Sequence, residues 1–173
     1  MKIYTREGDN GITSMFPNGR IPKTCARIDA LGTLDELNAW LGVIRTQGLT
    51  EDLSSEIETF QRLLFRMGAE ISSEDDFVTF ARISEEDVRI LEEKIDRFSD
   101  ILPQISDFVA FSGTSEAAFT QLARSVCRRA ERCILKARES GVKISSTTLA
   151  WINRFSDYLF MLGRILNEGK IHE

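Results

Sequence analysis

The sequence has one histidine, three cysteines and three prolines in 173 residues. No apolar run approaches the roughly 20 residues that a membrane-spanning helix needs. The single histidine, His172, argues against zinc or di-iron chemistry, since such centres combine histidine with clustered cysteine or carboxylate ligands. We therefore expect no protein ligands to a resident metal.

The odd cysteine count argues against a disulfide framework. Cys127 and Cys133 stand six residues apart on one expected helix and project in different directions. The N-terminal Met1-Lys2-Ile3-Tyr4 shows no apolar signal region. Reduced thiols and a cytoplasmic location are therefore expected.

Composition and charge indicate an ordinary globular domain. Apolar residues make up 42% and charged residues 28%, and the net charge is -5. An acidic chain gains little from phosphate backbones, so general nucleic-acid binding is not expected, and any phosphate site must be local. The length suits a single domain over residues 1–173.

Apolar periodicity predicts an all-α fold. Residues 1–24 are rich in glycine, proline and asparagine and read as irregular, with no strand pattern. After them, apolar residues recur at spacings of three and four, and the breaks between these stretches carry helix start and stop residues. The sequence predicts an antiparallel-type bundle over 25–169, with helices at about 25–47, 51–71, 84–102, 115–139 and 146–169.

The fourth expected helix carries four arginines between residues 124 and 132. A helical wheel puts an apolar side opposite Arg124, Arg128 and Glu131, with Arg129 and Arg132 on its flank. That apolar side comprises Phe119, Leu122, Val126, Ala130, Cys133 and Ala137. Guanidinium groups bind phosphate or carboxylate through a fork of donors, so the cluster indicates an anion site. An exposed basic helix surface is the alternative.

The N-terminal segment is a second candidate site. Glycines, hydroxyl side chains and a lysine are the groups that a phosphate-wrapping loop requires. They are Thr5, Gly8, Gly11, Thr13, Ser14 and Lys23. The P-loop spacing is absent, and a surface tail is the alternative.

Two further polar positions stand apart from the apolar pattern. Asp35 lies on a helix side otherwise made of Gly32, Ala39 and Gly42, which lets another backbone approach closely. We expect Asp35 to pair with an arginine across a helix interface, and Arg128 is a candidate, which suggests contact between subunits. Asn153 stands in the middle of the fifth expected helix. Its side chain is either an amide that binds a ligand or an ordinary residue of the helix surface.

Four stretches occur in a familiar order. They are Thr5-x-x-Gly8-Asp9-x-Gly11-x-Thr13 followed by Lys23, then residues 32–38 (GTLDELN), 126–132 (VCRRAER) and 153–160 (NRFSDYLF). Together they resemble the ATP:cob(I)alamin adenosyltransferases of the propanediol-utilisation type, over nearly the whole chain. The resemblance implies a five-helix bundle that forms a homotrimer, with sites between subunits and the 1–24 segment binding ATP.

The resemblance also implies a reaction and its residues. Cob(I)alamin would attack C5′ of ATP, giving adenosylcobalamin and tripolyphosphate, with Mg²⁺ accompanying the nucleotide. Arg128 and Asp35 would be catalytic and joined between subunits, and Phe108 would close the space beneath the corrin. The positions that would bind ATP are Thr5, Arg6, Glu7, Gly8, Thr13, Ser14, Lys23, Arg128, Arg129, Glu131, Arg132 and Asn153.

The sequence departs from the family pattern in one loop and at one further residue. Residues 109–113 read VAFSG, where Ile-Leu-Pro-Gly-Gly is usual, and Glu7 stands where threonine is common. The departure in the loop motivates a second hypothesis, a bundle that binds ATP and corrinoid without turnover. A third hypothesis is a structural helical oligomer whose arginines only pair with acids.

Overall fold

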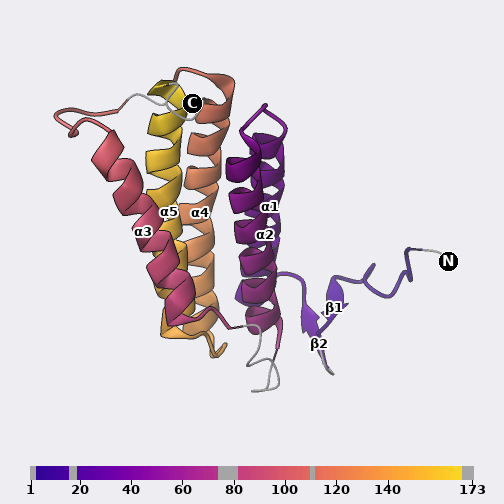
Figure 1. Ribbon diagram of the computed structural model, residues 1–173. Helices are drawn as coiled ribbons and strands as arrows, with labels where there is room; N and C mark the ends of the chain where they lie inside the picture. Colours follow the sequence, from indigo (N-terminus) through magenta and orange to yellow (C-terminus); the bar gives the residue numbers. More distant parts are fainter. Residues whose placement is uncertain (1–2, 16–18, 74–81, 110–111, 169–173) are drawn as a thin grey trace.

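The computed structural model describes residues 3–15, 19–73, 82–109 and 112–168. Within these ranges, five helices run side by side and a short hairpin precedes them (Figure 1). The helices are α1 (Ala26–Arg45), α2 (Glu51–Ser72), α3 (Glu85–Ile101), α4 (Ser115–Glu139) and α5 (Ser146–Glu168). The predicted all-α bundle is confirmed, and none of the described helices is long and apolar enough to span a membrane.

The helix boundaries follow the local sequence signals. The Thr50 hydroxyl accepts a hydrogen bond from the Leu53 amide at 3.4 Å and caps α2. Ser84 and Asp87 form a reciprocal capping box at the start of α3. Helix α4 ends before Gly141, which has a φ of 102° that favours glycine. The predicted helix boundaries are therefore correct to within two residues.

The expectation of an N-terminal segment without strands is wrong. Two short strands, β1 (Ile12–Ser14) and β2 (Arg20–Pro22), pair antiparallel with Thr13 opposite Ile21. Three-residue strands are too short for the alternation that marks a strand in a sequence. The hairpin and the residues before it extend away from the bundle near the start of α1 (Figure 1).

Helix α4 lies between α1 and α5 and packs closely on both. Its buried side therefore includes Ala123, Cys127 and Ile134 and is wider than a single stripe. Leu122, predicted to be on the apolar side, lies at the edge of this face and is 46% exposed. The prediction for Leu122 is wrong because contact with two helices turns the buried face away from it.

Aromatic side chains fill the centre of the bundle between α2, α3 and α5. Phe60 contacts Phe155 and Tyr158 edge to face, with ring centroids 5.2 and 4.9 Å apart. The fully buried Tyr158 donates its hydroxyl to Glu56 at 2.6 Å, and Lys94 of α3 forms an ion pair with the same carboxylate. These contacts hold α3 to the bundle.

Candidate functional site

A cleft of about 940 Å³ lies between α1, α4 and the end of the hairpin. Three residues predicted to bind ATP line it: Lys23 from the hairpin, and Arg129 and Arg132 from α4. Lys136, one turn beyond Arg132, adds a fourth cation. The fold therefore gathers positive charge from segments about a hundred residues apart in the sequence into one concave surface.

Acidic side chains of α1 share this cleft. Arg129 forms an exposed ion pair with Glu36, which lies beside it on α1. Asp29 accepts a hydrogen bond from the buried Cys133 thiol at 3.4 Å. The Arg132 side chain donates to the Arg128 carbonyl at 2.9 Å, and so lies along its own helix with its charge open to the cleft. Three cations of the cleft, Lys23, Arg132 and Lys136, have no acidic partner among the described residues, whereas Arg129 is paired with Glu36. An anion that enters the cleft would therefore meet three unpaired positive charges.

The N-terminal segment folds back on itself, so that Gly8 and Gly11 lie beside Lys23. Arg20 of β2 donates to the Glu7 carbonyl at 2.8 Å, and the Lys23 amide donates to the Gly11 carbonyl at 2.8 Å. A Cβ at Gly8 would lie 2.9 Å from the Lys23 Nζ, so the lysine passes directly over this glycine. The Thr5 hydroxyl accepts from the Glu7 amide at 3.4 Å.

The remaining N-terminal candidates lie along the same segment. Thr13 and Ser14 lie on β1, while Arg6 has a φ of 65° and its guanidinium stacks over the Tyr4 ring at 5.6 Å. The predicted N-terminal residues thus share one loop and hairpin with Lys23, which also reaches the cleft.

On the other side of α4, Glu131 faces Asn153 of α5. The Asn153 amide donates to Glu131 at 3.0 Å and accepts from Arg154 at 2.9 Å. Arg154 in turn donates to Glu92 of α3 at 3.0 Å. This chain of contacts fixes Asn153 between two charged residues, so its amide is oriented before any ligand arrives.

Arg128 and Asp35 are both exposed, and within the described part of the chain neither side chain has a hydrogen bond or an ion pair. Asp35 borders a groove of about 690 Å³ between α1 and α2, with Ala39, Gly42 and the 66% exposed Phe65. The two residues predicted to pair therefore do not meet within one chain.

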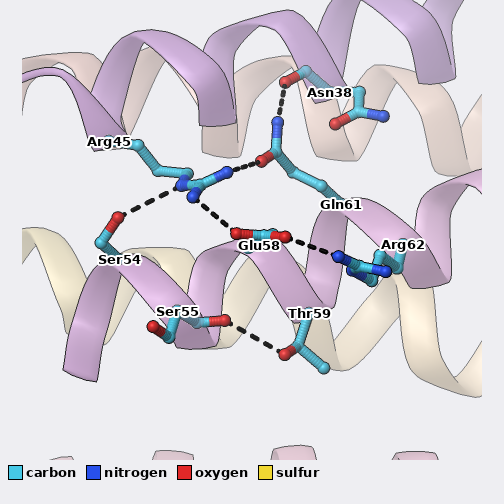
Figure 2. Close-up of polar contacts among 8 residues, drawn as sticks. All are labelled: Asn38, Arg45, Ser54, Ser55, Glu58, Thr59, Gln61 and Arg62. Carbon is cyan, nitrogen blue, oxygen red and sulfur yellow. Dashed lines mark hydrogen bonds and ion pairs between the residues drawn. The ribbon is translucent and has the colours of Figure 1, made fainter. Parts of the chain in front are cut away.

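A polar cluster fixes the walls of this second groove (Figure 2). Arg45 of α1 donates to Ser54 at 3.2 Å, to Gln61 at 2.9 Å and to Glu58 at 2.8 Å, all on α2. Gln61 also donates to the Asn38 carbonyl at 3.1 Å. Hydrogen bonds from Arg62 and Arg45 hold the pKa of Glu58 below its usual value. The groove beside Asp35 is thus a fixed surface.

Phe108 lies in the connection between α3 and α4 and is fully exposed. A groove of about 590 Å³ runs from Phe108 and Ile105 to Arg124 and Phe160. The Arg124 guanidinium stacks over the Phe160 ring at 5.2 Å. Burial, with repulsion from Arg128, lowers the pKa of Arg124. Ala110 and Phe111, two of the residues that depart from the family pattern, lie outside the described residues.

The hairpin and the connection between α3 and α4, which contains Phe108, lie at opposite ends of the bundle (Figure 1). Phe108 precedes the start of α4 at Ser115, whereas Lys23 shares a cleft with Lys136 near its end. Those 21 residues of helix correspond to roughly 30 Å at 1.5 Å per residue. One chain therefore cannot bring its own Lys23 and Phe108 to one small molecule.

Sequence reasoning missed several residues at these sites. Lys136 falls four residues after Arg132, a spacing that puts both on one side of a helix and was the available signal. Arg20, Arg164 and Asn167 act through backbone carbonyls or amides of distant segments, and no local pattern reveals such contacts.

Comparison with known proteins gives one consistent result. A family model described as Cobalamin adenosyltransferase matches residues 3–166. A corrinoid adenosyltransferase of Citrobacter freundii is 39% identical over 95% of this chain and 94% of its own length. A corrinoid adenosyltransferase of Bacillus subtilis is 34% identical over 96% of this chain and 87% of its own.

A solved structure agrees with these relatives. It is a variant of the PduO-type ATP:corrinoid adenosyltransferase from Lactobacillus reuteri, complexed with cobalamin and ATP. It is 35% identical to this chain, covers 98% of it and 92% of its own chain, and has a TM-score of 0.90. The family match, the relatives and the shared fold together place this chain in the cobalamin adenosyltransferase family.

Proposed function

We infer that this protein transfers the 5′-deoxyadenosyl group of ATP to cob(I)alamin, giving adenosylcobalamin and tripolyphosphate. The observation that carries this proposal is the cleft in which Lys23, Arg129 and Arg132 meet. In the reaction, the cobalt electron pair forms a bond to C5′, and the C5′–O bond breaks with its electrons leaving on tripolyphosphate. Cations that face this leaving group lower the barrier by neutralising the charge that develops on it.

The N-terminal loop suits the triphosphate. Its glycines expose backbone amides, Thr5, Thr13 and Ser14 offer hydroxyls, and Lys23 supplies a mobile cation. Glu7 and Arg6 lie beside them, and Arg20 holds the Glu7 carbonyl. On α4, Arg128 and Arg132 would contact the phosphates of ATP, with Arg129 and Glu131 beside them. Asn153 of α5 would hold the nucleotide. Asn153 is already held by Glu131 and Arg154.

Mg²⁺ enters this proposal with ATP, as part of the substrate. Among the described residues, no group of three or more His, Cys, Asp or Glu side chains is arranged to hold a metal ion. Mg²⁺ keeps several waters and binds phosphate oxygens, so it needs few protein ligands when it accompanies a triphosphate. Asp29 and Glu36 are the carboxylates that line the cleft.

The active form is proposed to be a homotrimer with each site between two subunits. Two observations support this. The hairpin and Phe108 lie roughly 30 Å apart along one chain, so a second copy is needed to complete a site. Asp35 and Arg128 are exposed with opposite charge on different faces, and each would find its partner on the neighbouring chain.

The corrin is proposed to lie against Phe108, at the groove that Phe160 and Ile105 also line. An aromatic side chain beneath the corrin would exclude water and the lower axial ligand of cobalt. Three free thiols, two of them buried, suit a reducing cytoplasm, which is the proposed location.

The test is anaerobic: purified protein, ATP, Mg²⁺ and chemically reduced cobalamin, followed by the visible spectrum. Growth of the light-sensitive adenosylcobalamin bands is the expected result. An unchanging spectrum under strong reduction, with ATP still bound, would overturn the transfer reaction in favour of a protein that only binds its ligands. Absence of ATP binding would leave only a structural oligomer.

A further inference from the structure

The connection between α3 and α4 is tied to α5 at both of its ends. Arg164 donates to the Pro103 carbonyl at 2.6 Å, next to the end of α3. Asn167 donates from its amide nitrogen to the Ser112 carbonyl at 2.8 Å. It also accepts from the Thr114 amide at 3.0 Å. Arg164 and Asn167 are three residues apart and therefore lie on the same side of α5.

Gly113 fits this arrangement closely. Its φ of 117° is open to glycine and strained for other residues. A Cβ at this position would also collide with the Asn167 carboxamide. The Asn167 carboxamide thus packs against a backbone conformation that favours glycine. It forms one hydrogen bond to the residue before Gly113 and one to the residue after it. The contact is a fitted clamp on residues 112–114.

Phe108 lies between the two attachment points. Its side chain is fully exposed, and the described local bond is from its own amide to Asp107 at 2.7 Å. The position of the Phe108 ring therefore depends on where the ends of the connection are held. A connection attached at both ends samples far fewer arrangements than one attached at a single end.

We propose that Asn167 and Arg164 are positioning residues for Phe108, which hold the connection so that its ring stands beneath the corrin. This rests on the proposed function. Neither side chain needs to touch a substrate. Loss of the Asn167 clamp removes two hydrogen bonds of ordinary strength, which corresponds to about tenfold in the population of the productive loop conformation.

The test compares Asn167→Ala with the parent enzyme in the full chain. The turnover number for adenosyl transfer should fall roughly tenfold while the KM for ATP stays within about twofold, because Asn167 is not among the residues proposed to bind the triphosphate. With ATP and cob(II)alamin bound, the variant should show a smaller fraction of cobalt without its lower axial ligand, by visible and electron paramagnetic resonance spectra. Ser115→Ala, an exposed hydroxyl change beside the clamp, is the matched control and should behave as the parent.

A double variant separates positioning from a general structural effect. If Asn167 acts through Phe108, adding Asn167→Ala to Phe108→Ala should cause no further loss of turnover or of the spectral signature. An equal further loss would overturn the proposal, as would parent-like turnover and spectrum for Asn167→Ala alone. Should Asn167→Ala fail to fold, Asn167→Asp keeps the acceptor for Thr114 but loses the donor to Ser112, and the same signature is expected. A parent protein that forms no adenosylcobalamin would instead refute the proposed function.

Discussion

Replacing Arg128 by alanine should separate catalysis from stability. Arg128 is exposed on α4, and its side chain has no hydrogen bond or ion pair among the described residues. Arginine and alanine are both good helix formers. Burial lowers the pKa of Arg124, and repulsion from Arg128 adds to this, so the substitution also removes an unfavourable like-charge contact. The free energy of unfolding of the single chain should therefore change by no more than about 0.5 kcal/mol.

Turnover should respond very differently. A guanidinium that faces the charge developing on tripolyphosphate is worth about 10² to 10³ in rate when it is removed. The assay is anaerobic formation of adenosylcobalamin at saturating ATP and reduced cobalamin, with the unfolding transition in urea measured in parallel. Arg138→Ala is the matched control, because Arg138 is also exposed, lies in the last turn of the same helix and is not among the residues proposed to bind ATP. If Arg128→Ala turned over like the parent, the assignment of Arg128 to the reacting phosphate would be wrong.

Three more expectations follow from the same contacts. Asp35→Asn should lower activity and weaken association of subunits, measured by sedimentation and turnover; an intact trimer with full activity would remove Asp35 from the site. Deletion of residues 2–14 should abolish ATP binding in calorimetry and preserve the helical circular dichroism signal, since the hairpin extends away from the bundle; retained ATP binding would contradict the role of this segment. Tyr158→Phe should cost about 1–2 kcal/mol in urea unfolding, because the hydroxyl that Glu56 accepts at 2.6 Å is lost from a fully buried position. An unchanged transition midpoint would show that this bond contributes nothing to stability.

The number and type of helices could be predicted because their signals are local. Thr50, Ser84 and Gly141 satisfy or terminate backbone hydrogen bonds within one turn of where they stand. Apolar residues at spacings of three and four define a buried side wherever a helix packs on one surface. The pattern failed at Leu122, since α4 packs on two neighbours and its buried face is set by both.

The candidate site was predictable only as a set of residue types. Sequence motifs singled out Lys23, Arg129 and Arg132, yet nothing in the chain order says that they line one cleft. Asp35 and Arg128 were expected to pair between subunits, and within the described residues of one chain they form no hydrogen bond or ion pair with each other.

The sequence by itself determined the helices, their caps and the identity of the charged side chains, because each depends on neighbours a few residues away. Only the tertiary structure decided which of those charges face one another. It turned Arg129 and Arg132 toward Lys23 and Glu131 toward Asn153, and it set Asn167 against Gly113. These contacts join residues from about 20 to more than 100 positions apart, and their geometry comes from how helices pack rather than from any local pattern.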